Sequence, residues 1–146
     1  MSDQVLALDL ERTLISDALT AEPRPGLHEF LEFCTERFAR VVLFTTVEQE
    51  TAWDVLSELS HRGFVPGLFF NRLEYVEWCG EYKDLVFVKS TTPDRVLLVD
   101  DDPGWIRPDQ HAQWVSISAW DGGQDNELVR IRSLLERRLD PQGANG

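Results

Sequence analysis

An apolar run ends at a carboxylate near the start of the chain, and the same arrangement returns near residue 100. The first run is Val5–Leu8 before Asp9, and the second is Val96–Val99 before Asp100 and Asp101. Continuous apolar runs of this length are typical of strands buried in a parallel sheet, and ligands of such sheets bind outside the carboxyl ends of the strands. If the two strands are neighbours, their carboxylates meet in one crevice, where like charges require protonation or a cation. The sequence therefore predicts a hard divalent metal such as Mg²⁺, which takes oxygen ligands.

Strand-like and helix-like segments alternate along the rest of the chain. Apolar residues at helical spacing predict helices over residues 27–38, 48–61 and 126–139. Apolar runs predict strands over residues 5–9, 41–44, 96–99 and 114–117. Residues 65–78 are expected to form a short strand or a hairpin, and 82–88 are ambiguous. Alternating β and α elements predict an α/β fold with a mostly parallel sheet and helices on both faces.

Length, charge and cysteine content restrict the class of protein. A chain of 146 residues supports a single domain over 1–146, with a core of about 5–139 and loose ends at 1–4 and 140–146. The net charge of −12 argues against an extended nucleic acid, which needs clustered Lys and Arg, and against an anionic membrane. Cys34 and Cys79 have no metal-ligand spacing, and we see no signal peptide. We therefore expect a cytoplasmic protein; its oligomeric state stays open.

Three predicted strands end in polar side chains suited to one reaction. These residues are Asp9, Thr45 and the pair Asp100-Asp101, and Lys83 lies between the second and third strand ends. A carboxylate can attack phosphorus and form an aspartyl-phosphate, while a metal neutralises the charge of the phosphate oxygens. A hydroxyl and an ammonium group bind the remaining oxygens, and a second carboxylate can protonate the leaving oxygen. The set is suited to phosphoryl transfer.

These positions resemble the four motifs of haloacid dehalogenase-type phosphatases, which are DxDxT after an apolar strand, a Thr or Ser, a Lys, and an acidic pair. The chain is further similar to the NLI-interacting-factor group, small phosphatases that act on the RNA polymerase C-terminal domain. The segments that carry this similarity are 24–31, 41–45, 82–85 and 99–103. The resemblance implies a Rossmann-like three-layer sandwich with a minimal cap, which consists of a flap over 15–22 and a possible short hairpin within 63–82.

The resemblance also implies a role for each matched residue. Asp9 would be the nucleophile, Glu11 the acid and base, and both Thr45 and Lys83 would hold the phosphate during catalysis. Mg²⁺ would be the cofactor. Its ligands would be Asp9, the backbone carbonyl of Glu11, Asp101, and Asp100 beside it.

Two positions next to these depart from the family pattern. Glu11 stands where the family has Asp, and its extra methylene displaces the acid by roughly 1 Å, which can cost on the order of a hundredfold in rate. Arg12 is unusually large; it either binds a second anionic group of the substrate or points to solvent. Thr13 would brace the loop that carries Asp9 and Glu11. Thr46 is a further candidate to bind the phosphate beside Thr45.

Other conspicuous residues are expected to have structural roles. His28, His61 and His111 have no metal-ligand spacing and are interpreted as surface or helix-end residues. Trp105 follows the acidic pair closely and is a candidate for the rim of the site.

The leading hypothesis is a Mg²⁺-dependent phosphomonoester hydrolase that acts through an aspartyl-phosphate. Its substrate would be accessible, a phosphopeptide or a small phosphoester, because a minimal cap leaves the site open. The alternative is a catalytically weakened phosphate-binding or protein-interaction module, which only Glu11 favours. A receiver-type domain phosphorylated on Asp9 is disfavoured, because its acidic pair usually precedes the phosphorylated Asp, and here the order is reversed.

Overall fold

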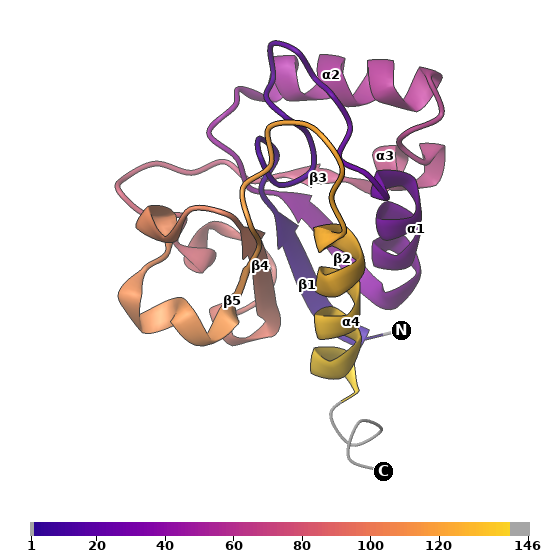
Figure 1. The fold of residues 1–146 in the computed structure, drawn as a ribbon. Coiled ribbons are helices and arrows are strands. Elements are labelled where there is room, and N and C mark those ends of the chain that lie inside the picture. The colour runs from indigo at the N-terminus through magenta and orange to yellow at the C-terminus, as the bar shows by residue number, and fades with distance from the viewer. Residues whose placement is uncertain (1, 141–146) are drawn as a thin grey trace.

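The computed structural model describes residues 2–140 of the chain. Within this range, five strands form one sheet in the order β3-β2-β1-β4-β5, and every neighbouring pair is parallel (Figure 1). The strands are β1 (Ser2–Leu8), β2 (Phe38–Leu43), β3 (Glu74–Tyr75), β4 (Val96–Asp100) and β5 (Trp114–Ser116). The predicted α/β, Rossmann-like fold is confirmed.

Helices occupy the connections between the strands. The α-helices of the described residues are α1 (Leu27–Arg37), α2 (Gln49–His61), α3 (Gly67–Arg72) and α4 (Glu127–Leu139). The 3₁₀ helices are η1 (Leu85–Phe87), η2 (Pro93–Arg95), η3 (Pro103–Trp105) and η4 (Pro108–Gln113). All four α-helices contribute to the apolar cluster on one face of the sheet.

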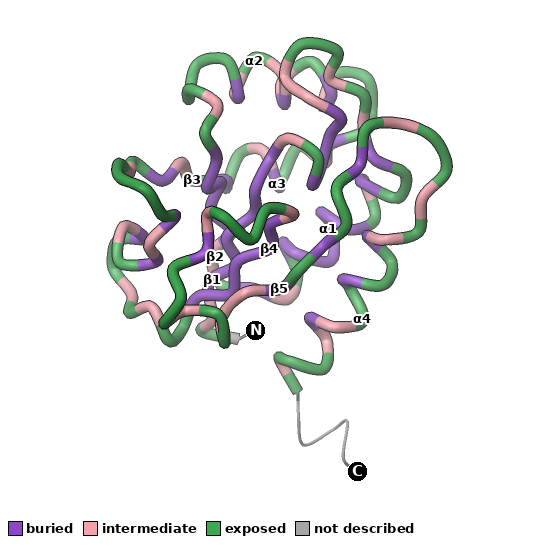
Figure 2. Tube along the Cα trace, turned by 60° about the vertical axis from the view of Figure 1, so that its left-hand side comes forward, coloured by how far each residue is buried: buried purple, intermediate pink, exposed green. Residues whose placement is uncertain are grey.

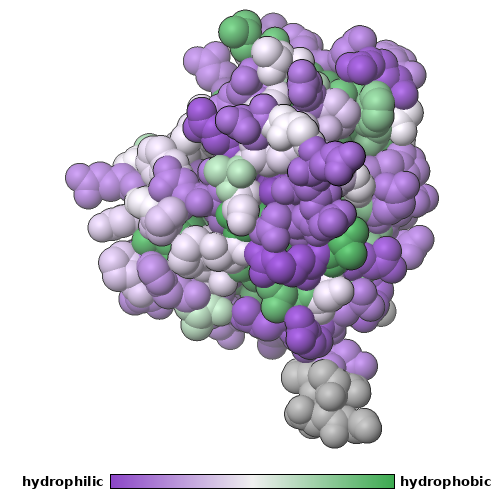
Figure 3. All heavy atoms as spheres, in the orientation of Figure 1, coloured by the Kyte–Doolittle hydropathy of each residue, from purple (hydrophilic) through white to green (hydrophobic). Residues whose placement is uncertain are grey.

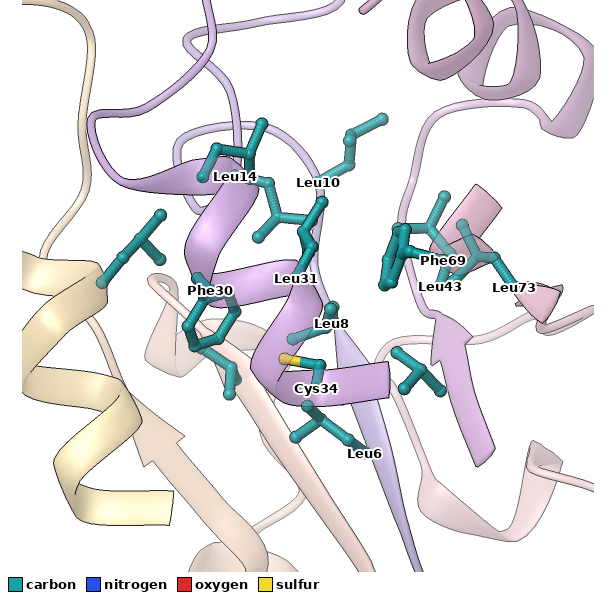
Figure 4. Packing of buried hydrophobic residues seen from close by; sticks show 14 of the residues in the cluster. Leu6, Leu8, Leu10, Leu14, Phe30, Leu31, Cys34, Leu43, Phe69 and Leu73 are labelled. Carbon is teal, nitrogen blue, oxygen red and sulfur yellow. The ribbon is translucent and has the colours of Figure 1, made fainter. Parts of the chain in front are cut away.

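Strand β1 separates the two apolar layers, because successive side chains of a strand point to opposite faces. Leu6 and Leu8 belong to the larger cluster, together with Leu31 and Cys34 of α1 (Figure 4). Val5 and Ala7 belong to a smaller cluster on the opposite face. That cluster is covered by η1 and neighbouring loops rather than by an α-helix, so this outer layer is thin.

Residues 65–78, predicted to form a short strand or a hairpin, contain a short strand but no hairpin. The strand is β3, whose two residues pair with β2 in parallel, and the helix α3 precedes it, which was not predicted. Phe69 is the buried residue of α3, and Val65 and Leu73 are buried just before and just after the helix. Burial at these three points holds the segment against the core. A hairpin is therefore not part of the cap.

Two strand boundaries also lie earlier than expected. β1 begins at Ser2, so residues 2–4 are part of the sheet rather than a loose end. β2 begins at Phe38, which is buried and was expected to close the preceding helix. Met1 and residues 141–146, the rest of the predicted loose ends, lie outside the described residues.

Burial is concentrated in the sheet and the inner faces of the helices (Figure 2). The space-filling view shows a mostly hydrophilic face with small, scattered hydrophobic patches (Figure 3). No helix within residues 2–140 is both long enough and apolar enough to cross a membrane.

Candidate active site

The carboxyl ends of β1, β2 and β4 bring the predicted motif residues to one edge of the sheet. Asp9 directly follows β1, and its backbone N–H donates to the carbonyl of Val99 in β4 at 3.0 Å. Asp100 is the last residue of β4, and Thr45 lies two residues after the end of β2. Because β1 lies between β2 and β4, Asp9, which follows β1, is central to this edge.

Three carboxylates form a cluster at this edge. Asp9, Asp100 and Asp101 each offer one oxygen, and these oxygens lie within 4.8 Å of one another. Asp100 is fully buried and Asp9 is 7% exposed. Magnesium ions are bound by such hard oxygen donors and are commonly held by one or two carboxylates together with water and substrate oxygens. The donor set therefore fits Mg²⁺.

The buried ammonium group of Lys83 lies between two of these carboxylates. Its Nζ donates to Asp9 at 2.9 Å and to Asp100 at 2.6 Å. The backbone N–H of Lys83 donates to the carbonyl of Trp105 at 2.8 Å, which fixes the loop that carries it. Burial alone lowers the pKa of Lys83, but the two negative charges outweigh burial and hold that pKa above its usual value. Lys83 therefore remains charged.

The carboxylates have the opposite response to burial. Desolvation raises the pKa of Asp9, and the charge of Asp100 adds to this rise while Lys83 opposes it. Burial likewise raises the pKa of Asp100, again against the effect of Lys83. One ammonium group thus does not balance three neighbouring carboxylates. The site favours a further cation, which lets all three remain ionised.

Two threonine hydroxyls adjoin the cluster. Thr13 Oγ1 lies 2.9 Å from Asp9 Oδ2 and 3.3 Å from Asp101 Oδ1, so its hydroxyl links the carboxylates of two loops. Thr45 is 1% exposed, and its Oγ1 accepts the N–H of Val47 at 3.1 Å. This bond leaves the hydroxyl proton of Thr45 able to donate. Thr46 is exposed.

Glu11 and Arg12 interact with the flap, residues 15–22. The side chain of Glu11 accepts the N–H of Ala18 at 2.7 Å, which ties it to the flap. Arg12 adopts a left-handed backbone conformation with φ of 63° and is exposed. Its positive charge contributes, after hydrogen bonds from Thr20, to lowering the pKa of Asp17 in the flap.

Arg24 is a residue that the sequence reasoning left without a role. Its side chain is fully buried and pairs with Asp125 through Nε at 2.7 Å and Nη2 at 3.1 Å. It also donates to the carbonyls of Arg12 and Thr13 at 3.1 Å and of Ser118 at 2.8 Å. Arg24 therefore holds the loop after β1 against the loop before α4. Only its place between two prolines distinguished it in the sequence.

Trp78 is a second residue without a predicted role. Its indole Nε1 donates to the carbonyl of Thr45 at 2.9 Å. Its ring meets Phe44 and Trp105 edge-on, with centroid distances of 5.5 and 5.6 Å. Trp78 thus supports the backbone of a candidate phosphate-binding residue, and Trp105 lies behind it as part of the same aromatic group.

The fold and site define an α/β protein with an acidic, metal-competent centre at the carboxyl edge of a parallel sheet. The chain belongs to the NLI interacting factor-like phosphatase family, whose sequence model matches residues 4–144. This match confirms the resemblance to haloacid dehalogenase-type phosphatases and supports phosphatase activity in general. Among curated proteins, none matches this chain.

Proposed function

We propose that the protein is a Mg²⁺-dependent phosphomonoester hydrolase that works through an aspartyl-phosphate. The contact between Asp9 and Lys83 carries this proposal. A buried carboxylate beside a charged ammonium group is placed to act as a nucleophile, while the ammonium attracts the phosphate oxygens. Family membership supports the reaction class in general.

In the first half of the reaction, a carboxylate oxygen of Asp9 attacks phosphorus and the bond from phosphorus to the leaving oxygen breaks. Lys83 and the hydroxyl of Thr45 bind phosphate oxygens that carry charge in the transition state. Glu11 donates its proton to the leaving oxygen, which departs as an alcohol. Phosphate is then bound covalently to Asp9.

In the second half, a water molecule replaces the alcohol. Glu11, now a carboxylate, accepts a proton from this water as it attacks phosphorus, and the bond from phosphorus to Asp9 breaks. Inorganic phosphate is released, Asp9 is again a carboxylate, and Glu11 is again protonated. The hydrogen bond from Ala18 supports this role of Glu11, because it restricts the orientation of the longer side chain.

Asp9, Asp100, Asp101 and the backbone carbonyl of Glu11 would hold Mg²⁺. When bound, the ion would neutralise the charge of the carboxylates and of the substrate phosphate. The closeness of the three carboxylate oxygens supports this assignment. Arg12 is exposed beside the flap and would contact a second anionic group of the substrate.

The substrate class follows from the size of the cap. The flap is a short loop and the segment between α2 and Lys83 contains only α3 and β3, so few residues are available to cover the site. An accessible phosphorylated group, on a peptide or a small phosphoester, suits this architecture better than a metabolite that must be enclosed.

Hydrolysis of p-nitrophenyl phosphate tests the proposal. We expect turnover with Mg²⁺, loss with a chelator, and a loss of at least about a thousandfold in Asp9→Asn, because the nucleophile is removed. Asp102→Asn is the matched control, since the exposed Asp102 side chain only accepts a local N–H from Gly104. It should retain activity within about twofold.

The outcomes separate the proposal from its alternative. Equal rates in wild type and Asp9→Asn would refute the covalent mechanism. Turnover that appears only in Glu11→Asp would favour a phosphate-binding module held inactive by one methylene.

A further inference from the structure

A cleft of about 300 Å³ opens beside the candidate phosphate-binding residues. It is lined by Thr45 and Thr46 and by the segment around Trp78. This volume lies at the lower end of the range for small-ligand pockets. A phosphate held at Thr45 would therefore have its attached group within reach of this cleft.

The aromatic wall of the cleft is held rigidly. Trp78 is fixed by its hydrogen bond to the carbonyl of Thr45 and by its edge contacts with Phe44 and Trp105. Tyr75 donates its hydroxyl to the carbonyl of Val47 at 2.7 Å. Aromatic faces attract cations electrostatically, and they do so most strongly when the ring is already in place.

The charge of the cleft is negative. Glu48 and Glu77 both line it, and after burial their charges are the causes that raise the pKa of Tyr75. Neither carboxylate forms an ion pair with a cationic side chain elsewhere in residues 2–140. Glu48 precedes α2 without forming a side-chain capping hydrogen bond. Two carboxylates are thus directed to a cleft where a substrate would lie.

We infer that Glu48 and Glu77, together with the ring of Trp78, select phosphopeptides with a lysine or arginine next to the phosphorylated residue. This inference rests on the proposed function. The phosphate would lie at Thr45 and Lys83, and the neighbouring cationic side chain would enter the cleft. The two carboxylates would attract that cation and repel an anionic group that enters the cleft, whereas Arg12 lies outside the cleft.

The same charges argue against other phosphoesters. A nucleotide or a nucleic-acid end brings additional negative charge to the surroundings of the phosphate, and the chain already carries a net charge of −12. A sugar phosphate would leave both carboxylates without a partner. A basic phosphopeptide offers each group of the cleft a complementary charge or surface.

The test compares phosphoserine peptides that differ only in the residues flanking phosphoserine, which are Lys in one peptide and Glu in the other. In wild type we expect kcat/KM to be about fivefold or more higher for the Lys peptide, as two partly exposed charge pairs allow. In Glu48→Gln/Glu77→Gln this ratio should fall toward one. Binding of both peptides to Asp9→Asn, measured by fluorescence polarisation, should show the same preference without turnover.

A control variant with the same change in charge isolates the cleft. Glu36→Gln/Glu58→Gln replaces two exposed glutamates outside the cleft, and it should keep the wild-type ratio. A ratio near one in wild type, or an unchanged ratio in Glu48→Gln/Glu77→Gln, would overturn the inference. Failure to hydrolyse p-nitrophenyl phosphate would instead refute the proposed function. The ratio of the affinities of the two peptides for Asp9→Asn would then still show whether the cleft selects the basic peptide.

Discussion

The ammonium nitrogen of Lys83 lies 2.9 Å from a carboxylate oxygen of Asp9, although 74 positions separate the two residues. The same nitrogen contacts Asp100, so one cation stabilises two buried acids from neighbouring strands. The free energy of this arrangement depends on all its members, because removal of one partner leaves an uncompensated buried charge.

Replacement of Lys83 is therefore expected to destabilise the metal-free protein. Lys83→Met should lower the free energy of unfolding by about 3 kcal/mol or more, since it leaves two carboxylates buried without their cation. Urea unfolding in the presence of a chelator measures this loss. Lys89→Met is the control, because Lys89 is the only other lysine and is exposed. Equal stability of the two variants would contradict the role of the ion pair.

Magnesium should stabilise the folded protein through the carboxylate cluster. At a concentration of 100 times its dissociation constant, an ion that binds only the folded state adds about 2.7 kcal/mol, which raises Tm by roughly 5–10 °C. Thermal unfolding of wild type with and without Mg²⁺ measures the shift. Asp101→Asn should reduce it and Asp102→Asn should not, although both remove one acid from the same loop. A full shift in Asp101→Asn would exclude this residue as a ligand.

The role of Glu11 predicts a dependence on the leaving group. Glu11→Gln should lower the hydrolysis of an alkyl phosphate such as phosphoserine by about a hundredfold or more. The quantity compared is kcat/KM, which reports formation of the aspartyl-phosphate and not its later hydrolysis, a step that both substrates share. By this measure the loss should be much smaller for p-nitrophenyl phosphate, whose leaving group needs little protonation. Ala18→Pro, which removes the N–H that binds Glu11, should show the same pattern more weakly. An equal loss on both substrates would indicate a structural role for Glu11.

Acid unfolding should report an ion pair outside the carboxylate cluster. Arg130 binds Glu127 and lowers its pKa to about 2, from the usual 4.5. Between these values the unfolded chain takes up a proton that the folded protein does not, so stability is lost as the pH falls from about 4.5 to about 2. Glu127→Gln should reduce this loss, as measured by urea unfolding across that range. Glu58→Gln, which alters an exposed acid, should leave the pH dependence unchanged.

The residues at the strand ends were predictable because their signal is local. An apolar run that stops at a polar side chain identifies a buried strand and its end, whatever the rest of the chain does. Asp9, Thr45 and Asp100 were placed in this way, and β1, β2 and β4 bring them to one edge. Within residues 65–78 the short strand was predicted and is present as β3. The helix around Phe69 was missed, because a short apolar run fits a strand or a helix equally well. In the folded protein this part of the segment is the helix α3, with Phe69 buried against the core.

The sequence by itself determined the parallel α/β class, the order of the motif residues and the excess of negative charge, because these depend on local polarity and composition. Tertiary structure alone decided which other side chains hold the motif residues in place. Arg24 meets Asp125 across 101 positions, and Trp78 reaches the carbonyl of Thr45. No local pattern encodes such contacts, since each depends on where two separate loops lie once the sheet has formed. The cleft beside Thr45, with its two carboxylates, exists for the same reason.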